Sequence, residues 1–210
     1  MSFSTPLNPT ATPFLPAVTS LPTLSDDALT STLDLLFELS PDLHTLALPT
    51  MRSISFDSYD ELISTIRDIL LALTETLSFT SDPSYPSTAI DDDAPKAPLL
   101  RILSAHPRLG EKKVDSALSR AEQANLRGGG GDSEEVLEQL RQLNEEYEKK
   151  FPGLRYVVFV NGRGRGEVMD DMRWRIDRGD YEEEEREGVR AMCDIARDRA
   201  GKLLGAAKGR

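Results

Sequence analysis

The chain has 210 residues, of which 39% are hydrophobic and 29% are charged, a composition typical of one globular domain with tails. Its formal net charge of −11 disfavours nucleic acid and anionic membrane surfaces as partners, because both are bound through clustered cations. The single cysteine, Cys193, excludes an internal disulfide and a cysteine-rich metal site.

The first 22 residues are rich in proline and threonine and lack helical periodicity, so we expect a flexible arm over residues 1–22. This segment has neither the basic start of a secretion signal nor the arginines of a mitochondrial presequence. The apolar runs elsewhere are too short to span a bilayer, which predicts no membrane partner. The ending "AAKGR" is no peroxisomal address, so we expect a cytoplasmic protein and leave a peroxisomal location open.

Helical periodicity predicts a first helix capped by Ser25 or Asp26, and the Ser40–Pro41 pair is expected to end it. A second helix is predicted to start near Asp57. The polar, proline-punctuated stretch 75–98 predicts an inserted loop. Helical spacing then resumes and should end at about His106, because Pro107 disfavours a helical residue before it.

A short helix is predicted over 116–126, and a glycine-rich linker over 127–132 follows it. A stronger helix begins at a capping box from Asp132 to Glu135. Two further helices are marked by apolar residues at helical spacing, namely Val168, Met172 and Ile176, then Val189, Met192, Ala196 and Leu203. Residues 156–160 have strand propensity but no run to pair with, so we expect a buried extended segment. The prediction is an all-α fold, with one compact helical domain over residues 23–207.

His106 is one of only two histidines and directly precedes Pro107. A histidine at a helix end most often bonds a backbone carbonyl, which is the simpler interpretation. Pro107 fixes the backbone after the histidine and can hold the imidazole toward a cleft. We therefore treat His106 as a candidate acid or base.

Ser119, Glu122 and Gln123 are spaced so that all three project from one face of the short helix. A hydroxyl, a carboxylate and an amide on one face suit a planar ring rich in N–H and C=O groups. A solvated polar face is the competing interpretation of the same pattern.

Arg163 follows the apolar segment, where a guanidinium is suited to bind a carboxylate or a carbonyl. The surrounding residues 161–167 lack the lysine–serine pair of a phosphate loop, so a nucleotide-binding protein is the weaker alternative. The acidic runs 91–93 and 182–185 fit no EF-hand spacing and predict solvated surface rather than a metal site.

Together these motifs resemble the 2-oxo-4-hydroxy-4-carboxy-5-ureidoimidazoline (OHCU) decarboxylase family, and its fungal members most. The resemblance is carried by "LFELSPDL", "AHPRLG", "SRAEQ", "LNEEYEKKFPGLRYVVFVNGR" and "CDIARDRA". It implies an all-helical homodimer, a carboxy-lyase of urate (purine) breakdown. Such an enzyme converts its small-molecule substrate OHCU to (S)-allantoin without a cofactor.

The resemblance also implies catalytic roles for His106, Glu122 and Arg163, and substrate contacts for Pro107, Ser119 and Gln123. The sequence departs from the family where Arg108 replaces a common aspartate. Arg155 or Arg165 could take the role of Arg163 instead. A helical interaction module that has lost activity is the alternative function for the whole chain.

Overall fold

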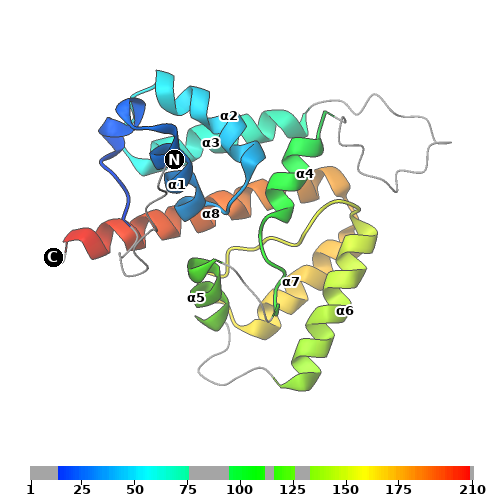
Figure 1. Cartoon of the computed structure of the whole chain (residues 1–210). Coiled ribbons are helices and arrows are strands. Elements are labelled where there is room, and N and C mark those ends of the chain that lie inside the picture. The colour runs from blue at the N-terminus through cyan, green and yellow to red at the C-terminus, as the bar shows by residue number, and fades with distance from the viewer. Residues whose placement is uncertain (1–13, 76–94, 112–115, 126–132, 209–210) are drawn as a thin grey trace, which may run out of the picture.

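The computed structural model describes residues 14–75, 95–111, 116–125 and 133–208. Within these ranges the chain forms helices and contains no strand, which confirms the all-α prediction (Figure 1). The helices are the 3₁₀-helix η1 (Val18–Thr23) and the α-helices α1 (Asp26–Leu36), α2 (Pro41–Ser53), α3 (Tyr59–Thr74), α4 (Ala97–Ser104), α5 (Ala117–Asn125), α6 (Glu134–Lys150), α7 (Arg165–Arg178) and α8 (Tyr181–Lys208).

Helix α8 runs through the middle of the molecule, with α1 to α4 on one side and α5 to α7 on the other (Figure 1). It packs along α3 and also contacts α1 and α4, while α6 packs against α7. The apolar face of α8 is fully buried at Val189 and Cys193, and so are Leu29 of α1 and Leu62 of α3. One core therefore extends along the length of α8. None of the helices in the described ranges is long and apolar enough to cross a membrane.

Serine side chains start several of the helices. The hydroxyls of Ser25, Ser58 and Ser133 each accept a hydrogen bond from the backbone N–H three residues later, as helix caps do. The prediction that Ser25 caps the first helix is confirmed. Asp132 of the expected capping box lies outside the described residues, and Ser133 is the cap of α6.

Helix α2 corrects the expectation that Ser40–Pro41 only ends a helix. Ser40 accepts a hydrogen bond from the N–H of Leu43, and Pro41 occupies the first turn of α2. Proline is favoured there because the first N–H groups of a helix have no partner in the helix itself. The dipeptide therefore starts α2, whereas α1 ends four residues before Ser40, at Leu36.

The described part of the predicted arm is packed onto the domain. Leu15 is buried and Leu21 is fully buried, and the hydroxyl of Tyr59 donates to the carbonyl of Pro16 at 2.8 Å. The flexible arm expected over 1–22 therefore does not extend through residues 14–22. Residues 1–13, most of the predicted loop 75–98 and all of the predicted linker 127–132 lie outside the described residues.

Residues 154–160 form neither helix nor strand and cross the molecule between α6 and α7 (Figure 1). Side chains satisfy carbonyls of this segment: Arg175 donates to Val157 at 3.0 Å, and Arg163 donates to Phe159 at 2.6 Å. Buried backbone groups need such partners when no neighbouring strand supplies them. The segment can therefore stay irregular without leaving these carbonyls unpaired.

Candidate active site

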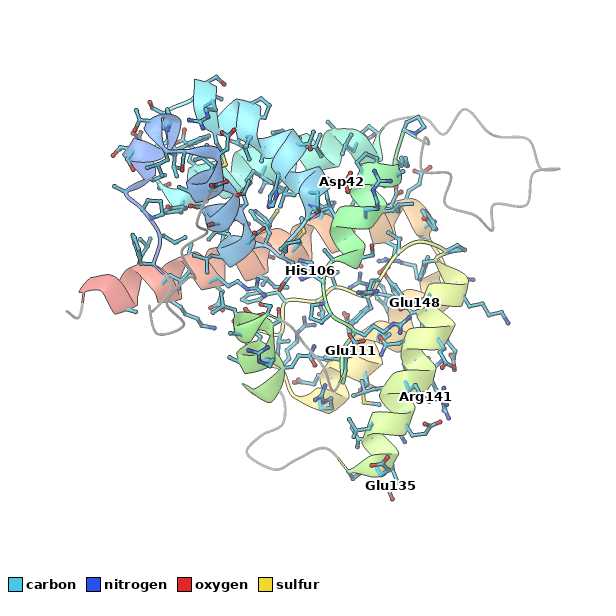
Figure 2. The ribbon with its side chains drawn as sticks, viewed as in Figure 1. Asp42, His106, Glu111, Glu135, Arg141 and Glu148 are labelled. Atoms are coloured by element: carbon cyan, nitrogen blue, oxygen red, sulfur yellow. The ribbon has the colours of Figure 1, made fainter. Side chains whose placement is uncertain are left out.

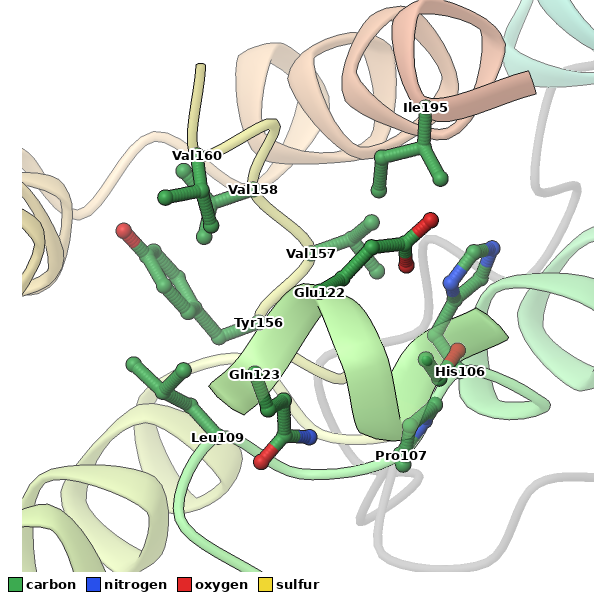
Figure 3. A pocket seen from close by; sticks show the side chains of 11 residues that line it. His106, Pro107, Leu109, Glu122, Gln123, Tyr156, Val157, Val158, Val160 and Ile195 are labelled. Atoms are coloured by element: carbon green, nitrogen blue, oxygen red, sulfur yellow. The ribbon is translucent and has the colours of Figure 1, made fainter. Parts of the chain in front are cut away.

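A pocket near the middle of the molecule collects most of the residues that the sequence motifs single out. Its walls come from the loop after α4, from α5, from the segment 156–160 and from α8. They are formed by His106, Pro107, Leu109, Ser119, Glu122, Gln123, Tyr156, Val157, Val158, Val160 and Ile195 (Figure 3). Figure 2 shows His106 at the centre of the molecule, whereas Glu135 and Arg141 mark the outer face of α6.

The loop that carries His106 is held by the side-chain amide of Gln123. This amide accepts a hydrogen bond from the N–H of Gly110 at 3.2 Å and donates to the carbonyl of Arg108 at 3.1 Å. Gly110 has a φ of +84°, and a Cβ there would lie 2.9 Å from Leu140 of α6. Only glycine fits this turn, because it tolerates positive φ and has no side chain to clash. Gln123 thus lines the pocket while both ends of its amide bond the loop.

The imidazole of His106 is buried, with 4% of its surface exposed. Burial, followed by the charges of Arg199 and Arg155, lowers the pKa of His106 to about 3. The Nε2 atom of this ring has no hydrogen-bond partner among the described residues. At neutral pH, His106 is therefore an uncharged imidazole with one nitrogen free to exchange a proton.

Arg199 of α8 links the polar residues on one side of the pocket through hydrogen bonds. Its guanidinium forms two hydrogen bonds to the Glu122 carboxylate, at 2.7 and 2.8 Å, and is itself only 1% exposed. The same group donates to Glu38 and to the hydroxyl of Ser119, each at 2.8 Å, and to the carbonyl of Phe37. Bidentate pairing of this kind fixes both the position and the plane of a carboxylate.

Two carboxylates share this one guanidinium. Burial on its own would lower the pKa of Arg199, but the hydrogen bonds and charge of Glu122, together with Glu38, raise it. The hydroxyl of Ser119 donates to Glu38 and accepts from Arg199, so its hydrogen bonds are used inside the network. Glu122 keeps 24% of its side chain exposed, and Figure 3 shows its carboxylate beside the His106 ring, below Ile195. Among the polar side chains of the pocket wall, Glu122 and His106 are therefore the acid and base candidates that lie side by side.

The sequence profile of the OHCU decarboxylase family matches residues 22–201 of this chain. The chain belongs to the OHCU decarboxylase family. It is also 31% identical over 120 residues to the uric acid degradation bifunctional protein PucL of Bacillus subtilis (strain 168). That match covers 57% of this chain but only 23% of the relative, so the chain corresponds to a minor part of the bifunctional protein.

Among solved structures, the chain is similar to a crystal structure of OHCU decarboxylase in the presence of (S)-allantoin. The TM-score is 0.55 at 20% identity, and the match covers 86% of this chain and 99% of the other. At this level of identity the likeness shows a shared fold. The helical domain described above is therefore an OHCU decarboxylase fold.

The structure does not bring Arg163, expected beside His106 and Glu122, into this pocket. The side chain of Arg163 turns back onto the segment before it and donates to the carbonyls of Phe159 and Val160. It lines a second hollow, which shares Val158 with the first pocket but has otherwise different walls. The reason is the turn at residues 161–162, where both residues have positive φ and the chain reverses before Arg163.

Arg155 and Arg165, the neighbouring arginines that could have taken this role, are also absent from the pocket lining. Arg155 instead donates to the main-chain carbonyl of His106 at 2.8 Å. The arginines that surround the apolar segment therefore do not supply a guanidinium to this pocket.

Arg199 and Glu38 are two residues that sequence reasoning missed. The guanidinium of Arg199 does not line the pocket but holds the carboxylate of Glu122, which does. Arg199 lies four residues after Ile195, so both side chains project from one face of α8. That spacing within the family motif "CDIARDRA" is the signal that was available.

Arg108, where the chain departs from the common family pattern, is absent from the pocket lining. Its guanidinium forms two 2.6 Å hydrogen bonds to Glu148 of α6. Arg108 therefore joins the His106 loop to α6 from outside the pocket wall.

Proposed function

We propose that this chain is a carboxy-lyase that converts OHCU to (S)-allantoin in urate breakdown. The observation that carries the proposal is the meeting of a neutral imidazole and a fixed carboxylate at one pocket, in a chain of the OHCU decarboxylase family. Sequence motifs far apart in the chain, at 105–110 and 119–123, supply these two groups.

The reaction breaks the bond between a ring carbon and its carboxylate, and CO₂ leaves. The electron pair of that bond forms a C=C bond to the carbon that bears the ureido group, and the pair of the ring C=N bond moves onto its nitrogen, which takes up a proton from solvent. The substrate itself therefore delocalises the charge. A proton is then added to the carbon that bears the ureido group, while the ring hydroxyl loses its proton and becomes a carbonyl. The chemistry requires a group that moves protons and a rigid frame that orients the ring, and needs no cofactor as an electron sink.

His106 is suited to move the proton. Its free Nε2 can accept the proton of the substrate hydroxyl and deliver a proton to the ring carbon. An anionic substrate in the pocket would raise the pKa of His106, because a nearby negative charge favours the imidazolium form. The pKa of His106, which is low in the empty pocket, therefore rises toward the working range when substrate binds.

Glu122 is suited to orient the ring by accepting hydrogen bonds from its ureido and ring N–H groups. Arg199 holds the carboxylate of Glu122 in one plane for this purpose. Next to the carboxylate of Glu122, Ile195 and Val157 form an apolar part of the pocket wall (Figure 3). Delivery of the proton from a single face, the one that His106 occupies, would give one enantiomer. Pro107, Ser119 and Gln123 complete the site as neighbours of these groups.

The test uses OHCU made in place from urate, by urate oxidase and a hydrolase that opens the oxidised ring. Circular dichroism then follows the allantoin that forms, with and without this chain. Fast appearance of the (S)-enantiomer is the expected result. Racemic allantoin that forms at the spontaneous rate would instead favour an inactive helical interaction module.

We also propose that the chain is a homodimer, as its family resemblance implies, and that it acts in the cytoplasm or the peroxisome. Light scattering coupled to size-exclusion chromatography tests the first point, since a dimer has twice the mass of the 23.2 kDa chain. Imaging of the full chain fused to a fluorescent protein, beside a peroxisomal marker, tests the second.

A further inference from the structure

Arg155 lies behind the candidate site, and the proposed mechanism gives it no role. It is half-buried in the irregular segment, and its Nη1 donates to the main-chain carbonyl of His106 at 2.8 Å. Arg155 is absent from the residues that line the pocket, so it does not face a substrate there. The hydrogen bond nevertheless fixes the peptide that carries the imidazole.

Four charged residues near His106 belong to four different parts of the fold. Glu38 precedes α2, Glu122 lies on α5, Arg199 lies on α8, and Arg155 belongs to the segment after α6. Glu38 and Glu122 both pair with Arg199. Within the described part of the chain, by contrast, Arg155 pairs with no carboxylate and donates only to His106. Of these four residues, Arg155 is therefore the one whose charge is not paired with an opposite charge.

We propose that Arg155 is a positioning residue that fixes the backbone of His106 and, through its charge, keeps the imidazole unprotonated. A positive charge close to a buried imidazole opposes a second positive charge on the ring. This effect adds to burial and to Arg199, which act in the same direction. Arg155 thus helps to keep Nε2 available as a proton acceptor before substrate arrives.

The test is a series of three variants that change the charge at one position: Arg155→Lys, Arg155→Gln and Arg155→Glu. Lysine and glutamine can still donate to the carbonyl of His106, but only lysine keeps the positive charge. Two-dimensional NMR follows the ring signals of His106 against pH in each variant. The chain has only two histidines, so His44→Gln assigns the signals, and circular dichroism checks that each variant is folded.

Asn144 supplies a matched control without charge. Its side chain donates to the carbonyl of Leu109 at 3.0 Å, so Asn144→Ala loosens the same loop while leaving every charge in place. We expect the pH at which His106 titrates to rise from Lys to Gln to Glu, by on the order of one pH unit over the series. In the Asn144 variant, His106 should titrate at the same pH as in the unmodified chain.

The proposal would be overturned if the ring signals showed that His106 stays unprotonated over the same pH range in all the variants. So would shifts that the Asn144 control reproduces, because a loosened loop would then explain them. If the Glu variant does not fold, the difference between Lys and Gln decides. The acid limb of the pH profile of kcat/KM should move in the same order as the NMR titrations. This kinetic expectation alone rests on the proposed decarboxylase function. The NMR series stands without activity, so failure of one proposal can be told from failure of the other.

Discussion

At the scale of single residues, His106 is arranged for chemistry at the expense of stability. A buried polar atom without a partner costs about 1–3 kcal/mol, and folded domains carry few of them. The Nε2 of His106 is such an atom among the described residues. Its neighbour Glu122, in contrast, is held by two hydrogen bonds from a buried guanidinium. One group is left free and the other is fixed, which matches a proton carrier beside an orienting carboxylate.

Replacing His106 with asparagine should leave a folded protein whose turnover falls about 100-fold or more, the usual scale for a lost general acid or base. The initial rate of (S)-allantoin formation, followed by circular dichroism, measures the loss. His44→Asn is the matched control, because His44 pairs with Asp34 and does not line the pocket. Near-normal turnover by the His106 variant would remove this residue from the mechanism.

The choice between Arg199 and Arg163 can be decided by two conservative replacements. Arg199→Lys keeps the charge but cannot reproduce the bidentate hold on Glu122, so we expect kcat/KM to fall about 100-fold. Arg163→Lys should keep most of the activity, because Arg163 does not line the pocket and donates to backbone carbonyls. Kinetics of both variants under identical conditions provide the comparison. A greater loss in the Arg163 variant would restore the expectation drawn from the sequence.

At this scale, local spacing was enough to predict part of the site. Ser119, Glu122 and Gln123 come together because they share one helical turn, and His106 and Pro107 are neighbours in sequence. The Glu38–Arg199 pair joins residues 161 positions apart, and only the packing of α8 against α1 brings them together. No local pattern encodes that contact, which is why the sequence pointed to Arg163.

At the scale of elements, the starts of helices were easier to predict than the conformation and hydrogen-bond partners of the segments that connect them. The caps of α1 and α3 are local signals, and the structure contains both. The Ser40–Pro41 pair is ambiguous, since the same residues can end one helix and begin another. Residues 156–160 were expected to form a buried extended segment, but the arginines that satisfy its carbonyls come from α7 and from the turn before it. Strand or helix propensity does not predict such side-chain partners, and Arg175 lies 18 residues from Val157.

The loop that carries His106 depends on Gly110, which a pair of alanine variants can test. Gly110 and Gly162 both have positive φ, so alanine strains each by about 1–2 kcal/mol. Only at Gly110 would the added Cβ meet a neighbour, Leu140, which adds about 1–3 kcal/mol. We expect Gly110→Ala to lower both the free energy of unfolding and the turnover more than Gly162→Ala does. Urea denaturation and initial rates measure both effects, and equal losses would count against the tight fit at Gly110.

At the scale of the whole molecule, not all of the carboxylates behind the net charge of −11 lie on the surface. The acidic run 182–185 was expected to be solvated, but Glu184 and Glu185 are buried at the start of α8. Glu184 pairs with arginines of α7, and Glu185 pairs with Lys96 next to α4. Buried carboxylates need such partners, and here the partners connect both sides of the fold to its central helix.

Burial of neutral His106 also makes the stability of the whole chain depend on pH. The pKa of His106 is about 3 in the folded chain, against 6.5 for an unperturbed imidazole, so below pH 6.5 the unfolded chain binds one more proton. The contribution of this residue is therefore fully present above pH 6.5 and is lost as the pH falls toward 3. The loss approaches about 1.4 kcal/mol for each pH unit.

Urea denaturation of the unmodified chain and of His106→Asn, at several pH values between about 7 and about 4.5, isolates this effect. Other titrating groups are common to both proteins, so their contributions cancel in the difference between the two unfolding free energies. We expect this difference to shrink by about 2 kcal/mol between about pH 6.5 and about pH 5, because asparagine binds no proton. A difference that stays constant with pH would mean that His106 binds its proton equally well in the folded and the unfolded chain. Burial would then not keep the imidazole uncharged, as the proposed mechanism requires.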